Sequence, residues 1–104
     1  MNIKDSTFLV TGGSAGIGKA TAKLLVEKGG KVAITGRDKS KLEKVAKEIG
    51  AFPIHADVAV ESDVHKTYEQ FLKQFGKLDC LINNAGIGDA WNEITELDMK
   101  SFHR

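Results

Sequence analysis

The chain has 104 residues, which is enough for one domain but too few for a second hydrophobic core. Hydrophobic residues make up 41% of the sequence and charged residues 28%, a composition that excludes a largely disordered chain. The net charge of +1 gives no support to a nucleic-acid or acidic-membrane partner, and without an apolar run near the roughly 18 residues of a membrane span or a signal-peptide layout we expect a cytoplasmic protein.

The first half of the sequence alternates strand and helix signals. Residues 7–11 form a short apolar run with β-branched side chains, which predicts a strand buried on both faces of a parallel sheet. Residues 17–25 follow a helical spacing, and the glycines at 29–30 provide a helix end. Residues 32–35 predict a second strand, and the apolar stripe within 42–49 predicts a helix that stops at the next glycine.

The second half continues this alternation. Residues 52–56 predict a weaker strand, and Pro53 within it favours the edge of a sheet because proline has no N–H for a ladder. Residues 64–75 carry the strongest helical stripe, and residues 78–82 predict a fourth buried strand. Because such crossovers almost always join parallel strands with a right-handed turn, the predicted fold is an open α/β sheet of four strands in the order 3-2-1-4, flanked by helices.

The fourth predicted strand contains the single cysteine of the chain. Cys80 cannot form an internal disulfide, and it lies in an apolar run. We therefore expect a buried core side chain rather than a redox or metal-binding group. The three histidines lack the spacing and the cysteine partners of a metal site, so no metal is expected.

Three glycines lie in the turn between the first strand and the first helix, at positions 12, 16 and 18. In this context glycines allow a tight turn and a close approach to a pyrophosphate, and the helix N–H groups point at its charge. The expected ligand is a dinucleotide, and the alternative is a glycine-rich connection with no ligand. The spacing Gly-x-x-x-Gly-x-Gly differs from the more common Gly-x-Gly-x-x-Gly.

The run from Thr11 to Gly18 closely resembles the Thr-Gly-x-x-x-Gly-x-Gly motif of the short-chain dehydrogenase/reductase family. The sequence Asn-Asn-Ala-Gly at 83–86, directly after the fourth strand, is similar to that family's second motif. Asp57-Val58, just past the third strand, resembles the family's adenine-contacting pair. The resemblance covers essentially the whole chain and implies one NAD(P)-binding, Rossmann-like domain over residues 1–104, without the C-terminal half of the family fold.

The resemblance implies a set of cofactor-binding residues. Those that border the pyrophosphate and ribose are Gly12, Ser14, Gly16, Ile17 and Gly18. Those that contact adenine are Asp57, which accepts from the amino group, and Val58. Those that line the middle of the cofactor are Asn84, Ala85 and Gly86. As alternatives, Asp57 caps a turn and the asparagine pair braces neighbouring loops through bonds to the backbone.

The end of the second strand bears on the choice of cofactor. A carboxylate there binds the ribose 2′-OH, whereas an arginine accommodates a 2′-phosphate. The resemblance places Gly36 at the acidic, NAD-selecting position and Arg37 at the adjacent basic one, which favours NADP(H) over NAD(H). Two residues oppose this: Asp38, about 20 residues past the glycine turn, is an alternative ribose carboxylate, although we favour a helix cap. Ala15 stands where many NADP(H)-using members carry a second basic residue.

The family's reaction is hydride transfer between the nicotinamide and a carbonyl or alcohol, assisted by a Tyr-x-x-x-Lys pair and an upstream serine. Tyr68 is the only tyrosine here, and the residue four positions later is Leu72. We therefore expect the front part of an NAD(P)-dependent oxidoreductase, without catalytic residues and inactive on its own. A stand-alone nucleotide-binding or interaction module is the alternative. Such a chain would leave the apolar strand at 78–82 with an unpaired edge, which predicts self-association.

Overall fold

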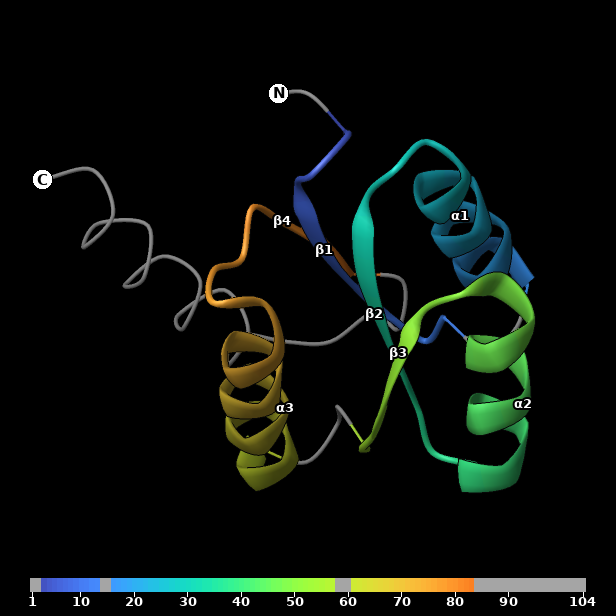
Figure 1. The fold of residues 1–104 in the computed structure, drawn as a ribbon. Coiled ribbons are helices and arrows are strands. Elements are labelled where there is room, and N and C mark those ends of the chain that lie inside the picture. The colour runs from blue at the N-terminus through green and yellow to red at the C-terminus, as the bar shows by residue number, and fades with distance from the viewer. Residues whose placement is uncertain (1–2, 14–15, 58–60, 84–104) are drawn as a thin grey trace, which may run out of the picture.

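The computed structural model describes residues 3–13, 16–57 and 61–83, and within these ranges strands and helices alternate strictly (Figure 1). This confirms the predicted pattern of four strands and three helices. The elements are β1 (Thr7–Thr11), α1 (Gly16–Glu27), β2 (Lys31–Gly36), α2 (Lys39–Ile49), β3 (Phe52–His55), α3 (Glu61–Phe75) and β4 (Cys80–Asn83). None of the described helices is both long and apolar enough to cross a membrane.

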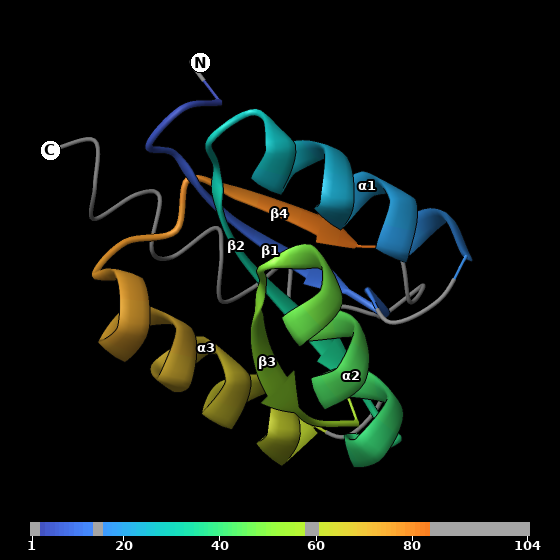
Figure 2. The same ribbon diagram turned by 45° about the vertical axis from the view of Figure 1, so that its right-hand side comes forward.

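The strands form one sheet in the order β3-β2-β1-β4, with every neighbouring pair parallel (Figure 2). The predicted order is therefore confirmed, and the architecture is a Rossmann-like open α/β sheet. Strand β3 lies at one edge, as Pro53 indicates, and this proline stands opposite Ile34 of β2. Strand β1 occupies the interior between β2 and β4, which explains why all five of its residues are buried.

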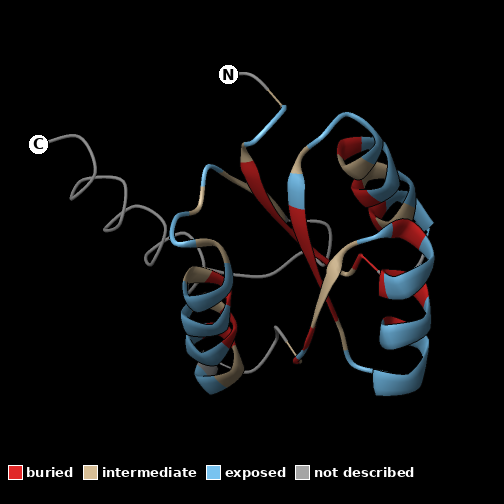
Figure 3. Ribbon diagram, viewed as in Figure 1, coloured by how far each residue is buried: buried red, intermediate tan, exposed pale blue. Residues whose placement is uncertain are grey.

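The sheet has a helical layer on each face, with α1 and α2 on one side and α3 on the other (Figure 1). The side chains of a strand alternate between faces, so Phe8 and Val10 pack with the buried residues of α1 and α2, while Leu9 packs with Val64 and Phe71 of α3. Figure 3 shows that the buried residues of each helix face the sheet. The apolar stripes seen in the sequence are thus the faces that hold the three layers together.

Both ends of α2 are formed by side chains and backbone suited to capping. Asp38 is the N-cap, and its Oδ1 accepts from the Lys41 N–H at 3.2 Å. Gly50 closes the helix in the left-handed conformation, with φ of 81°, and its N–H donates to Ala46 O at 2.8 Å. The interpretation of Asp38 as a helix cap is confirmed.

Strand β4 begins at Cys80, two residues later than predicted, because the Thr7 N–H of β1 is bonded to the side chain of Asp79 and not to a backbone carbonyl. The Thr7 N–H donates to Asp79 Oδ2 at 2.8 Å, and the Asp79 N–H donates to Thr7 Oγ1 at 2.9 Å. Desolvation alone would raise the pKa of Asp79, but the bonds from Thr7 and the Lys77 ammonium, 3.2 Å away, outweigh it and hold this pKa below its usual value.

Cys80 corrects another expectation, since its side chain is only partly buried. It packs against the core on the α1 and α2 side of the sheet without being enclosed there. Burial raises the pKa of the thiol, and the negative charge of Asp79 raises it further. The cause of the partial exposure is the position of β4 at the edge of the described sheet.

Candidate functional site

The carboxyl ends of the strands meet at one edge of the sheet, because all the pairings are parallel. The turn at 12–13 follows β1, the connection at 37–38 follows β2, and Asp57 lies just past β3. In open α/β sheets this edge is where ligands bind. Those motif residues that the structure describes therefore lie around one edge of the sheet, although they are far apart in the chain.

Glycine is required for different structural reasons at the three motif positions of the first turn. Gly12 and Gly16 have φ of 66° and 58°, a region that other residues rarely adopt. A Cβ on Gly16 would meet nothing within 4 Å beyond the adjacent residues and the backbone of its own helix, so the backbone conformation accounts for the glycine. Gly18 is buried in α1, where a small residue lets the helix lie close to the sheet.

The start of α1 is suited to an anion. No acidic side chain lies in its first turn, so the positive end of the helix dipole is not neutralised there. Ile17 is 77% exposed, which leaves a large apolar side chain at this end of the helix. Ser14 and Ala15, which precede the helix, lie outside the described residues.

Gly13 is a further glycine whose importance the motif did not indicate. It is buried, and a Cβ placed on it would lie 2.5 Å from Ile34 Cγ2 and 2.7 Å from Ile34 Cβ. Only hydrogen fits in this space, so the turn lies directly against β2. The sequence holds no signal for this contact, since it depends on the distance between β1 and β2.

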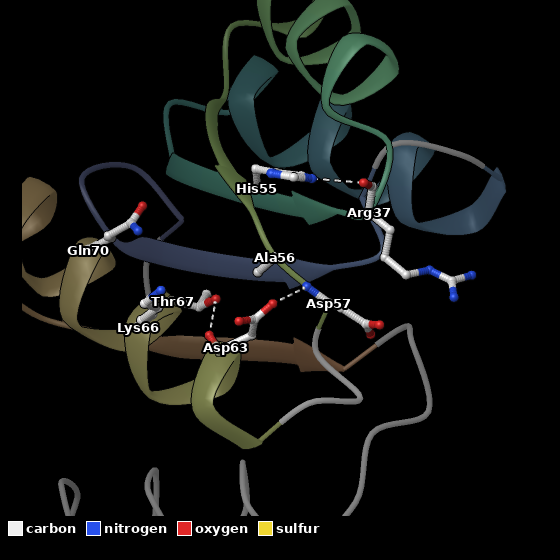
Figure 4. A pocket seen from close by; sticks show the side chains of 8 residues that line it. All are labelled: Arg37, His55, Ala56, Asp57, Asp63, Lys66, Thr67 and Gln70. Atoms are coloured by element: carbon white, nitrogen blue, oxygen red, sulfur yellow. Dashed lines mark hydrogen bonds between the residues drawn. The ribbon is translucent and has the colours of Figure 1, made fainter.

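Past β2 and β3 lies a pocket of about 490 Å³ that brings Arg37 and Asp57 together (Figure 4). Its lining residues are Arg37, His55, Ala56, Asp57, Asp63, Lys66, Thr67 and Gln70. The side chains of Arg37 and Asp57 extend toward the same side of the pocket, and Arg37 is exposed. The sequence motifs predicted two of these residues. Those from α3 were missed, because they are polar residues spread along the helix, and an apolar stripe identifies only the hydrophobic side chains that face the core.

Hydrogen bonds hold the backbone around this pocket. His55 Nε2 lies 2.8 Å from Arg37 O, and since a carbonyl only accepts, this nitrogen carries the hydrogen. The Asp57 N–H donates to Asp63 Oδ2 at 2.9 Å, and Thr67 Oγ1 donates to Asp63 O at 2.7 Å (Figure 4). The carboxylate that fixes the turn after β3 is therefore that of Asp63, whereas the carboxylate of Asp57 extends away from it.

The second motif begins beside the glycine turn. Asn83 is the last residue of β4 and stands opposite Thr11, and Thr11 Oγ1 donates to the neighbouring Ile82 O at 3.4 Å. The remaining motif residues, Asn84, Ala85 and Gly86, lie outside the described residues, as does Val58. The described geometry thus brings the two motifs to adjacent strand ends.

A family model described as short chain dehydrogenase matches residues 6–104. Ipsdienol dehydrogenase of Ips pini is 39% identical over 100 residues, an alignment that covers 96% of this chain and 39% of that protein. The chain therefore spans well under half the length of this curated relative.

Solved structures agree with this match. A 3-ketoacyl-(acyl-carrier-protein) reductase from Brucella melitensis, in complex with NADH, has a TM-score of 0.73 and 41% identity, with 76% of this chain and 34% of that chain covered. A short chain dehydrogenase from Bacillus anthracis has a TM-score of 0.76 and 38% identity, with 81% and 36% covered.

Proposed function

The chain belongs to the short-chain dehydrogenase family, and from this membership we propose that residues 1–104 form the dinucleotide-binding part of an oxidoreductase that transfers hydride between NADP(H) and a carbonyl or alcohol. The observation that carries the proposal is the turn between β1 and α1. Gly12 and Gly16 adopt positive φ there, and the turn leads into a helix whose first turn has no acidic side chain. A pyrophosphate fits this combination of a glycine turn, which lets a ligand approach the backbone closely, and a helix dipole.

The proposed cofactor contacts follow the strand ends. The residues assigned to the pyrophosphate and ribose are Gly12, Ser14, Gly16, Ile17 and Gly18. The residues assigned to the adenosine half are Arg37, Asp57 and Val58, and those assigned to the middle of the cofactor are Asn84, Ala85 and Gly86. The bound cofactor supplies or takes up the hydride. With no Tyr-x-x-x-Lys pair in these 104 residues, the proposal gives them the binding and orientation of the cofactor and no proton transfer.

The preference for NADP(H) rests on Arg37. Its side chain is exposed beside the pocket past β2 and β3, where a 2′-phosphate would follow the adenosine ribose. The competing carboxylate, Asp38, caps α2 through its bond from the Lys41 N–H. The NADH bound to the Brucella melitensis reductase supports a dinucleotide as the ligand class and leaves the 2′-phosphate to be tested.

Calorimetric titration of the chain with NADPH and with NADH tests this proposal. A charge-assisted contact to phosphate contributes about 1.5–3 kcal/mol, so we expect NADPH to bind roughly 10- to 100-fold more tightly. Arg37→Ala should narrow this ratio toward one. Lys44→Ala, which removes an exposed cation from α2 away from the pocket, should leave it unchanged. Equal affinities of the unmodified chain for the two cofactors would refute the preference.

A further inference from the structure

Thr35, near the end of β2, forms two hydrogen bonds with the glycine-rich turn. Its hydroxyl Oγ1 accepts from the Gly12 N–H at 3.2 Å, and its carbonyl oxygen accepts from the Gly13 N–H at 3.2 Å. Thr35 is only 1% exposed, so these bonds are shielded from water on the strand side. A single buried residue therefore contacts the backbone of two consecutive residues in the turn.

The preceding residue fixes the same turn by packing. Ile34 is fully buried, and its Cγ2 and Cβ fill the space in which a side chain of Gly13 would lie. Ile34 thus determines how closely the turn approaches β2, and Thr35 fixes the orientation of the Gly12 and Gly13 N–H groups, which donate to it. The glycine turn is held by the neighbouring strand as well as by its own conformation.

The residues that follow Thr35 in the chain lead directly to Arg37, the proposed 2′-phosphate contact. Two residues further on, Arg37 O accepts from His55, and Gly36 O accepts from the Ala56 N–H at 3.2 Å, so the end of β2 is bonded to β3. We propose that Thr35 is a positioning residue for dinucleotide binding, whose hydroxyl holds the Gly12 backbone in the orientation that receives the pyrophosphate. This inference rests on the proposed function, since it concerns the same site.

Replacement of Thr35 by valine isolates the hydroxyl, because valine has nearly the same shape and is favourable in strands but cannot accept a hydrogen bond. Since the pyrophosphate is common to both cofactors, the dissociation constants for NADPH and NADH should rise together by about five- to tenfold. Their ratio should not change, in contrast to Arg37→Ala. Thr35→Ser, which keeps the hydroxyl, should restore binding.

The chain offers a matched control in Thr7, a second threonine that is 1% exposed. It lies on β1 at the opposite end of the sheet, where its hydroxyl donates to Lys77 O at 2.8 Å. Thr7→Val removes a buried hydroxyl and destabilises the fold, but we expect no change in cofactor affinity. The comparison separates positioning of the turn from a general loss of stability.

Amide hydrogen exchange without nucleotide distinguishes failure of the inference from failure of the proposed function. In Thr35→Val, the Gly12 amide should exchange about tenfold faster, whereas it should not change in Thr7→Val. If the unmodified chain bound neither cofactor, the proposed function would be wrong and with it the role of Thr35 in binding. If it bound both, then unchanged affinities in Thr35→Val, or equal losses in Thr7→Val, would overturn the inference. Should Thr35→Val fail to fold, Thr35→Ala also removes the acceptor, and full affinity in that variant would be equally decisive against the inference.

Discussion

One added methyl group at Gly13 tests whether the glycine turn lies as close to β2 as the structure shows. In Gly13→Ala the new Cβ would lie 2.5 Å from Ile34 Cγ2 and 3.3 Å from Val10 O. Carbon atoms in protein interiors pack at about 3.5–4.0 Å, so the turn or the isoleucine must move by roughly 1 Å. Ile34 is fully buried between β2 and the helices on that face, which restricts its movement.

The expected cost follows from the energetics of overpacked cores. Inserting a methyl group into a well-packed site costs about 1–3 kcal/mol, and we expect about 2 kcal/mol for Gly13→Ala. In a chain of this size that corresponds to a fall in Tm of about 8–16 °C. Backbone strain adds little, because Gly13 is not among the described glycines with positive φ.

A double-mutant cycle measured by urea denaturation identifies the atom responsible. Ile34→Leu removes Cγ2 while conserving volume, and by itself should cost less than about 1.5 kcal/mol. If Cγ2 is the obstacle, Gly13→Ala should be less destabilising in the Ile34→Leu background. Additive effects within about 0.5 kcal/mol would show that this contact is not the cause, and a cost of Gly13→Ala below that value would refute the close approach itself.

Two further predictions concern the residue that precedes β4 and the outer edge of that strand. Because the pKa of Asp79 is lowered in the folded chain, the unfolded chain binds more protons near and below pH 4, and the free energy of unfolding falls as the pH drops through this range. Asp79→Asn should make that fall less steep and should cost about 1 kcal/mol at pH 7, as measured by denaturation at a series of pH values. In the described residues β4 is an edge strand, so we expect light scattering to show self-association at tens of micromolar. Leu81→Lys should weaken this association. A chain that stays monomeric with and without this substitution would show that the edge of β4 is not a contact between copies.

Most of the fold can be predicted from the sequence because short-range patterns of apolar residues indicate the strands and the buried faces of the helices in an α/β protein. The apolar run of β1 and the stripes of α2 and α3 reveal which faces are buried, and Pro53 places β3 at an edge. The left-handed glycine at position 50 ends α2 where the stripe stops. Each of these signals lies within one element, so no knowledge of tertiary contacts is needed to read it.

The start of β4 could not be predicted in the same way. Its apolar run begins at Leu78, but Asp79 bonds to Thr7, a residue 72 positions away in the chain. An aspartate next to a strand is ordinarily a turn or loop residue, and its sequence context does not show that a threonine N–H and hydroxyl face it across the sheet. The boundary therefore depends on a tertiary contact between β1 and the residue that precedes β4.

The residues of the candidate site can likewise be divided into those with local sequence signals and those that act through tertiary contacts. Glycines 12, 16 and 18 could be identified because each position places a local demand on the backbone or on helix packing. Thr35 and Ile34 could not, because they act on the turn from a different strand and resemble any other β-branched residues in a buried run. Asp63 was missed for a related reason, since its bond to the Asp57 N–H depends on how α3 meets the end of β3.

The end of β2 thus combines two functions over four residues. Positions 34 and 35 hold the glycine turn in place, while position 37 presents a cation at the pocket past β3. Because Arg37 is exposed and the two preceding contacts are buried, its substitution changes the local charge without moving the turn. On the proposed assignment of the cofactor contacts, substitutions at positions 36 and 37 should change cofactor preference without changing the geometry proposed for the pyrophosphate, provided that Ile34 and Thr35 are kept.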